Sequence, residues 1–177
     1  TSGVGLHKRG CRADAGEAPL KETLAAALVM LSGWQPSQLL LDPLCGSGTI
    51  LIAAALLGRH IAPGLDRTFA SEAWPAVPPA LWQAARRNAQ AAIRFGEPLR
   101  LQGSDMDRHV LATAKQNALK AGVDEDVAFS QKKVQDVWID QQHGTLISNP
   151  PYGMRLSGFK EINQIYIALN KMFRKKS

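Results

Sequence analysis

The chain has 177 residues, of which 45% are hydrophobic and 20% charged, proportions typical of one globular domain. Its longest apolar run, Thr49 to Leu57, is too short to span a bilayer, and its polar start, Thr1 to Arg12, lacks the apolar core of a signal peptide. The two cysteines and four histidines show no zinc-ligand spacing. We therefore expect a cytoplasmic protein with no membrane contact and no metal.

The balance of charge is basic, with a formal net charge of +6 and a sequence pI near 9.6. Such a charge favours association with an anionic partner such as a nucleic acid. A solvated basic surface explains the same numbers, so charge alone leaves both interpretations open. The basic residues gather at 7–12, 86–87, 132–133 and 174–176.

The first third of the chain predicts a helix, a strand and a second helix. Good helix formers occupy 20–31, and Pro19 stands where it can open that helix. The wholly apolar run 39–41 predicts a strand that is buried on both faces. A buried helix is predicted over 49–57, where Gly58 ends it.

The rest of the chain continues the alternation after an irregular stretch at 59–79, which is rich in proline and aromatic residues. Helices are predicted over 80–95, 108–121 and 159–174, and strands over 99–104, 127–134 and 145–148. Alternating strands and helices are typical of parallel βα units, so the fold class is α/β.

A glycine-rich loop follows Asp42 at the end of the first predicted strand. Gly46 and Gly48 allow the backbone to turn sharply, and the following helix directs free N–H groups and its positive end into the same space. That space suits a carboxylate or a phosphate. The loop lacks the Walker lysine and the third glycine of the dinucleotide fingerprint, so a simple strand-to-helix turn remains the alternative.

A second acidic turn, Gly103 to Asp107, follows the next predicted strand. Asp105 can accept hydrogen bonds from both hydroxyls of a ribose, Met106 can flank an adenine, and Asp136 can accept from the adenine amino group. Taken singly, a helix N-cap at Asp107 and a core position for Met106 are the simpler interpretations. Asp136 fits an ordinary turn equally well.

The segment Asn149-Pro150-Pro151-Tyr152, directly after the last predicted strand, is the most specific feature. Its prolines restrict the backbone so that the Asn149 side-chain oxygen and the Pro150 carbonyl can be neighbouring acceptors. Two acceptors suit one exocyclic nucleobase amine and direct its lone pair toward an electrophile, while Tyr152 can stack on the base. A rigid surface turn is the alternative.

The three features stand in one order, at 42–49, 103–107 and 149–153. In that order and spacing they resemble the class I S-adenosylmethionine-dependent methyltransferases. Further segments are similar to the THUMP-associated RNA guanine-N2 methyltransferases, of the bacterial RlmL and YpsC type, and they lie at 6–10, 18–25, 62–64 and 71–75. The resemblance covers essentially the whole chain.

This resemblance implies a Rossmann-like class I methyltransferase sheet, doubly wound and mostly parallel. It also implies transfer of a methyl group from S-adenosyl-L-methionine to the exocyclic 2-amino group of a guanosine in RNA, with 23S ribosomal RNA as the expected target. Residues 1–177 would form one catalytic domain, with a first segment and helix over 1–33 and the cofactor-binding and Asn-Pro-Pro-Tyr core over 34–177.

Site residues follow from the resemblance position by position. The cofactor would contact Pro19, Lys21, Glu22, Thr23, Asp42, Leu44, Cys45, Gly46, Ser47, Gly48, Thr49, Asp105, Met106, Asp136 and Asn149. The catalytic group at the target base would be Asn149, Pro150, Pro151 and Tyr152. RNA would be captured by His7, Lys8, Arg9 and Arg12, together with a THUMP domain outside this chain.

The chain also departs from the family pattern. Ala53 and Met154 stand where glutamate is common, and Cys11 stands where tyrosine is common. The family implies a seven-stranded sheet, yet only four strands are predicted here, so we expect a partial domain without the C-terminal strands or the THUMP module.

Three other functions are alternatives to this interpretation. A DNA adenine-N6 methyltransferase uses the same chemistry, because Asn-Pro-Pro-Tyr serves any exocyclic amine. A non-catalytic nucleoside-binding or RNA-binding remnant is compatible with the short sheet and Ala53. A nicotinamide oxidoreductase is the most distant alternative.

Overall fold

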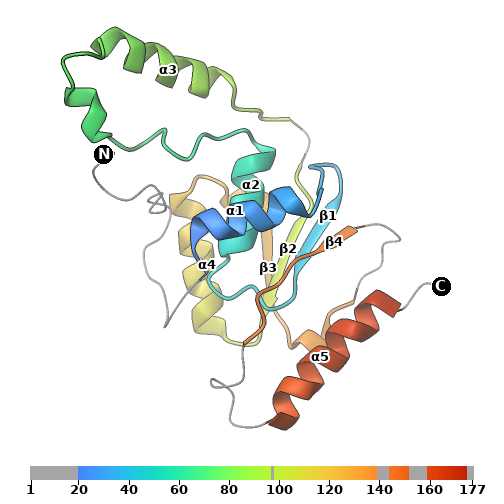
Figure 1. Cartoon of the computed structure of the whole chain (residues 1–177). Coiled ribbons are helices and arrows are strands. Elements are labelled where there is room, and N and C mark those ends of the chain that lie inside the picture. The colour runs from blue at the N-terminus through green and yellow to red at the C-terminus, as the bar shows by residue number, and fades with distance from the viewer. Residues whose placement is uncertain (1–19, 97, 139–143, 152–158, 175–177) are drawn as a thin grey trace.

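The protein is described by a computed structural model, which covers residues 20–96, 98–138, 144–151 and 159–174. Its centre is a parallel sheet in the order β3-β2-β1-β4 (Figure 1). The strands are β1 (Leu39–Asp42), β2 (Leu101–Asp105), β3 (Val127–Gln131) and β4 (Gly144–Leu146). All four residues of β1 are buried, as the apolar run predicted.

The chain reverses its direction of travel across the sheet at β1. It moves outward from β1 to β2 and β3, and then returns to place β4 on the other side of β1. Leu41 is paired with Gln102 of β2 and with Leu146 of β4. Open α/β sheets bind ligands outside the carboxyl ends of their strands at such a reversal. The fold therefore predicts a ligand site at the carboxyl ends of β1 and β4.

Helices pack against the sheet and against one another. The helix α2 (Thr49–Gly58) packs on β1 and β2 beneath α1 (Glu22–Leu31), and α4 (Arg108–Lys120) packs on β2 and β3. Figure 1 shows α5 (Phe159–Arg174) apart from these three helices, next to the short turn η3 (Val134–Asp136). Ala53 lies in the buried core of α2, so the alanine serves packing there.

Residues 62–95 leave the core and form a projection that we call the arm (Figure 1). It contains η1 (Ala70–Ala73) and α3 (Pro79–Ala91), and none of the α3 residues is buried. Within the arm, Arg86 donates to the carbonyl oxygens of Leu65 and Arg67, both at 2.7 Å, and to Glu72. Hydrogen bonds within the arm therefore help to hold its segments together.

Several element boundaries differ from the sequence prediction. The helix predicted to reach Phe95 ends at Ala91, because the Arg94 N–H donates to the Arg59 carbonyl at the foot of the arm. The third strand ends at Gln131 instead of continuing to 134, because the chain then turns into η3. The second and fourth strands were predicted within two residues of their observed bounds.

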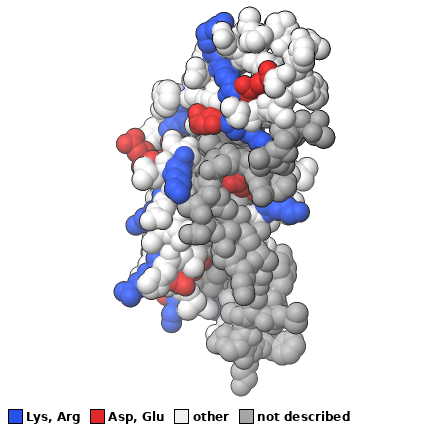
Figure 2. Space-filling model, turned by 90° about the vertical axis from the view of Figure 1, so that its left-hand side faces the viewer, with Lys and Arg blue, Asp and Glu red and all other residues white. Residues whose placement is uncertain are grey.

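On the face drawn in Figure 2, the described charged side chains of the two signs are interspersed. The net positive charge therefore does not by itself mark a binding surface there. In the described part of the chain, no helix has the length and apolar character needed to cross a bilayer.

Candidate active site

The loop between β1 and α2 is shaped by hydrogen bonds within the protein. Gly46 and Gly48 have φ values of +53° and +80°, which L-residues with a side chain rarely adopt. The Gly46 N–H donates to Asp105 Oδ2 at 3.1 Å, and the Gly48 N–H donates to the Cys45 carbonyl at 2.9 Å. These two amides are occupied, which corrects in part the prediction that the N–H groups of the loop are free for a ligand.

The two glycines are required for different reasons. A Cβ added at Gly48 would lie 3.0 Å from Phe129 Cζ and 3.2 Å from the Cβ of Ala114, so packing against β3 and α4 excludes a side chain. A Cβ at Gly46 would meet no atom within 4 Å. The protein thus leaves open space beside Gly46, where a ligand can approach the backbone.

Asp105, at the carboxyl end of β2, organises the second acidic turn. Its Oδ2 accepts from Gly46, and its Oδ1 accepts from the Asp107 N–H at 3.0 Å. A carboxylate has about four acceptor positions, so Asp105 retains capacity for two more hydrogen bonds. Asp107 caps α4 by accepting from the His109 N–H at 2.8 Å, as predicted. Met106 is 66% exposed, so the core interpretation of this residue is wrong.

Asp42 is a buried carboxyl at the centre of the site, with only 2% of its surface exposed. Its Oδ1 accepts from the Ser148 hydroxyl at 2.7 Å and from the Leu44 N–H at 3.2 Å. Burial raises the pKa of Asp42 to about 7, while these two hydrogen bonds lower it and the nearby Asp105 charge raises it. Burial also raises the pKa of the Cys45 thiol, so Cys45 is an unreactive core residue.

The segment after β4 lies directly beside the end of β1. The Ile147 N–H donates to the Leu41 carbonyl at 3.1 Å, and Ser148 reaches Asp42. Asn149, which comes next, is exposed, and Pro150 is half-buried. Tyr152, the fourth member of the predicted catalytic group, lies outside the described residues, as do Cys11 and Met154.

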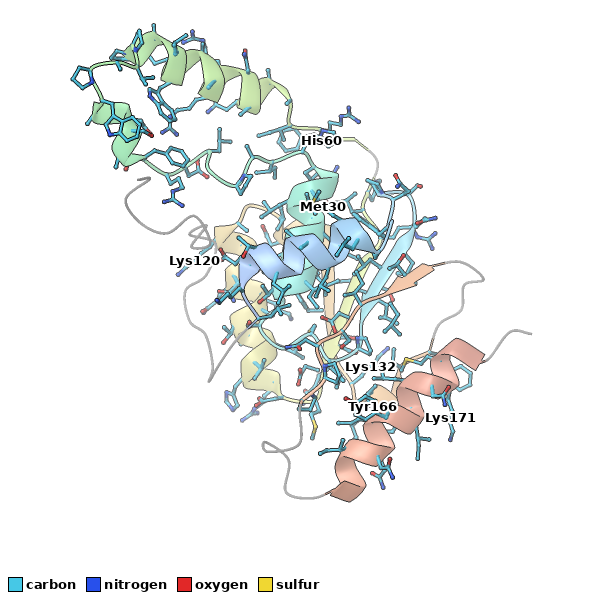
Figure 3. The ribbon with its side chains drawn as sticks, in the orientation of Figure 1. Met30, His60, Lys120, Lys132, Tyr166 and Lys171 are labelled. Carbon is cyan, nitrogen blue, oxygen red and sulfur yellow. The ribbon has the colours of Figure 1, made fainter. Side chains whose placement is uncertain are left out.

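The other residues predicted to contact the cofactor or the RNA lie in different parts of the protein. Lys21, Glu22 and Thr23 lie at the start of α1, which packs against α2. Asp136 is exposed in η3, a turn that contacts α5. In Figure 3, Lys132 lies toward α5, and His60 lies on the other side of the core, at the foot of the arm. The remaining predictions, Pro19 and the RNA-binding His7, Lys8, Arg9 and Arg12, fall outside the described residues.

Three residues that support this site were not predicted from the sequence. Asn117 of α4 is 2% exposed and donates from Nδ2 to the Ser47 carbonyl at 3.1 Å. Gln131 donates to the Met106 carbonyl at 3.1 Å, and Ser148 holds Asp42. A signal existed only for Asn117, which occupies an apolar position of the inward face of its helix, three residues after Ala114.

The arrangement brings together a shaped loop, a carboxylate with remaining acceptor capacity and an Asn-Pro-Pro segment, of which Asn149 is exposed, at one edge of the sheet. Among the described residues, no group of three or more His, Cys, Asp or Glu side chains is placed to hold a metal ion. A parallel sheet that carries these features after its first, second and fourth strands defines a Rossmann-like class I methyltransferase domain. The predicted fold class is confirmed.

Comparison with known sequences gives the family. Residues 9–177 match the UPF0020 family, described as RMKL-like, methyltransferase domain. The chain belongs to this family, and the predicted resemblance to methyltransferases of this kind is confirmed.

Curated relatives match almost the entire chain. YpsC of Bacillus subtilis (strain 168), whose name assigns it provisionally to the RNA methyltransferases, is 45% identical over 98% of this chain and 45% of its own length. The ribosomal RNA large subunit methyltransferase K/L of Shewanella frigidimarina is 47% identical over 98% of this chain and 25% of its own length. The chain therefore spans less than half the length of these relatives.

Solved structures agree on the fold. The crystal structure of SMU.472, described provisionally as a methyltransferase and complexed with SAH, has a TM-score of 0.91 and 40% identity, and the match covers 98% of this chain and 45% of that one. A predicted N6-adenine-specific DNA methylase from Listeria monocytogenes has a TM-score of 0.90 and 44% identity over 97% of this chain and 45% of its own. The description of the Listeria protein names DNA, whereas the names of YpsC and methyltransferase K/L name RNA.

Proposed function

We propose that this domain transfers a methyl group from S-adenosyl-L-methionine to the 2-amino group of a guanosine in RNA of the large ribosomal subunit, in the cytoplasm. The observation that carries the proposal is the placement of the Asn149 segment beside Asp42 and the glycine loop, at the reversal of the sheet. The names of YpsC and of methyltransferase K/L support RNA as the substrate class.

The described residues fit the proposed cofactor. Asp105 has acceptor capacity left for the ribose hydroxyls, and the open space beside Gly46 admits the methionine part of the molecule. Exposed Met106 is accessible to the adenine, and Asp136 of η3 is the proposed acceptor for its amino group. The SAH complex of SMU.472 supports this choice of cofactor. The cofactor supplies an electrophilic methyl group, and the protein supplies position.

Asn149 and Pro150 would bind the acceptor amine. The Asn149 side-chain oxygen and the Pro150 carbonyl would each accept one hydrogen of the amine, which aligns the nitrogen lone pair with the methyl group. Tyr152 would stack on the base and hold its plane. The nitrogen becomes acidic as its new bond forms, so its proton can leave to water, and the role requires no dedicated base.

RNA would be bound by surfaces beyond this edge of the sheet. We assign the basic residues His7, Lys8, Arg9 and Arg12, and a THUMP domain outside this chain, to contacts with the phosphate backbone. Because such contacts release counterions, RNA affinity should fall steeply as salt increases. The guanine must leave its stack to reach Asn149, so unpaired or locally opened RNA is the expected substrate.

The proposal is tested by methyl transfer from tritiated cofactor to ribosomal RNA and, in parallel, to duplex DNA. Mass spectrometry of the digested product should identify N2-methylguanosine. N6-methyladenine in DNA would instead support the second candidate, a DNA adenine-N6 methyltransferase, which the name of the Listeria relative favours. Tight cofactor binding without transfer to either nucleic acid would support a binding protein, and tight NAD binding would overturn the assignment.

A further inference from the structure

Ser148 occupies a junction between the two halves of the proposed site. On its N-terminal side, Ile147 is still held by a backbone hydrogen bond to Leu41 of β1. On its C-terminal side, Asn149 is exposed and makes no hydrogen bond to another described residue. The Ser148 hydroxyl donates to Asp42 at 2.7 Å, and among the described residues this is the last hydrogen bond that anchors the chain before the exposed Asn149.

Asp42 is also attached to the cofactor loop. The same oxygen, Oδ1, that accepts from Ser148 accepts from the Leu44 N–H at 3.2 Å, where the loop begins. The carboxyl is 2% exposed, so water does not compete for these contacts. One buried oxygen atom thus joins the loop after β1 to the segment after β4, across 106 positions in the sequence.

We propose that Ser148 is a positioning residue for methyl transfer, because its hydrogen bond to Asp42 holds Asn149 at a set position relative to the cofactor loop. The inference rests on the proposed function of the site. Ser148 does not itself contact the acceptor base, since its hydroxyl points to a buried carboxyl. Its effect is on alignment, and a displacement of about 1 Å between reacting groups can cost roughly 100-fold in rate.

The test compares Ser148→Ala and Ser148→Thr with a matched control, Ser130→Ala, in the whole protein. Ser130 is a hydroxyl residue of β3 whose contact with the Gly103 carbonyl is long, at 3.5 Å. We expect Ser148→Ala to lower kcat by about 10-fold or more, with cofactor Kd from calorimetry changed by less than about threefold. Ser148→Thr keeps the hydroxyl and should restore most of the rate, and Ser130→Ala should match the wild type.

A second readout does not depend on activity. The Asp42 carboxyl is followed through a pH titration by 13C NMR in wild type and in Ser148→Ala. The Ser148 hydrogen bond lowers the pKa of Asp42 against the larger effect of burial, so its removal should raise that pKa further. The other groups that act on Asp42, the Leu44 N–H and the Asp105 carboxylate, are retained in both proteins.

The outcomes separate this inference from the proposed function. If the wild type transfers methyl groups and Ser148→Ala retains its kcat, the positioning role is wrong. Equal losses of kcat and cofactor affinity in Ser148→Ala, without rescue by threonine, would also overturn it, because they indicate general damage to the loop. If the wild type transfers no methyl group, the proposed function fails, and an unchanged Asp42 pKa in Ser148→Ala then rejects the anchor itself.

Discussion

The carboxyl edge of the sheet and the arm are held together in contrasting ways. At the edge, hydrogen bonds join residues that are far apart in the sequence, such as Gly46 to Asp105 and Asn117 to Ser47. In the arm, α3 buries no residue, and the hydrogen bonds of Arg86 to other described residues stay within the arm. A stack between Phe69 and Trp82, with centroids 5.6 Å apart, adds another contact inside the arm.

The fold keeps the preorganised edge of the sheet structurally separate from the arm. The edge combines burial with long-range hydrogen bonds, so its loops are preorganised for a ligand. The arm is tied to the core at its foot, where Arg59 pairs with Asp126 and accepts a hydrogen bond from Arg94. We therefore expect substitutions at the edge to alter binding and transfer, and substitutions in the arm to act locally.

The largest expected effect concerns Asp105. Asp105→Ala should weaken cofactor binding by at least about 100-fold, because two hydrogen bonds to a charged acceptor are lost and each is typically worth about 1.5–3 kcal/mol. The substitution also removes the acceptor for the Gly46 N–H, which loosens the loop. Isothermal titration calorimetry measures the change, and unchanged affinity would reject the assigned role.

Asn149→Ala separates transfer from binding at the same edge. The variant loses one of the two acceptors for the target amine and keeps the glycine loop, so kcat should fall roughly 100-fold with little change in cofactor affinity. Tyr152→Ala should behave similarly by removing about 1–3 kcal/mol of stacking. Steady-state kinetics on RNA check both variants. Full activity of Asn149→Ala would contradict the proposed chemistry.

Asp42 provides a pH test of the buried edge. Its pKa is 3.8 when unperturbed and about 7 in the folded protein, so the folded state holds an extra proton between these values. This contribution favours folding at low pH and is lost as pH rises. Relative to Asp42→Asn, which does not titrate, the wild type should lose about 2–3 kcal/mol of unfolding free energy between about pH 5 and pH 8. Denaturant unfolding at both pH values gives this difference, and parallel pH profiles would show that Asp42 is not buried as described.

The smallest effect is expected in the arm. Arg86→Met removes the hydrogen bonds of Arg86 to two carbonyl oxygens and its ion pair with Glu72. The two side chains of this pair are partly exposed, Arg86 at 29% and Glu72 at 27%. Because such pairs contribute little, the global unfolding free energy should change by less than about 1 kcal/mol. Hydrogen exchange should increase within the arm only. Arg87→Met, at the exposed neighbouring position, is the control, and a change in cofactor affinity in Arg86→Met would show that arm and edge are coupled.

Much of the fold was predictable because local patterns carry it. The apolar run 39–41, the helix former pattern in 108–121 and the Asp107 cap all appear in the structure close to their predicted places. Boundaries failed where a distant partner decides them. The arm helix ends early because the Arg94 N–H donates to the Arg59 carbonyl, and no local sequence pattern predicts this backbone hydrogen bond.

By itself, the sequence determined the α/β class, the order of the motifs and most of the candidate residues, because periodicity, glycine and proline act over a few neighbouring positions. Only the tertiary structure decided which polar groups hold those motifs in place. The strand order sets β4 against β1, and this contact brings Ser148 to Asp42, while burial of that carboxyl raises its pKa to about 7. Burial and hydrogen bonding across 106 positions depend on the packed sheet, so no local pattern can encode them.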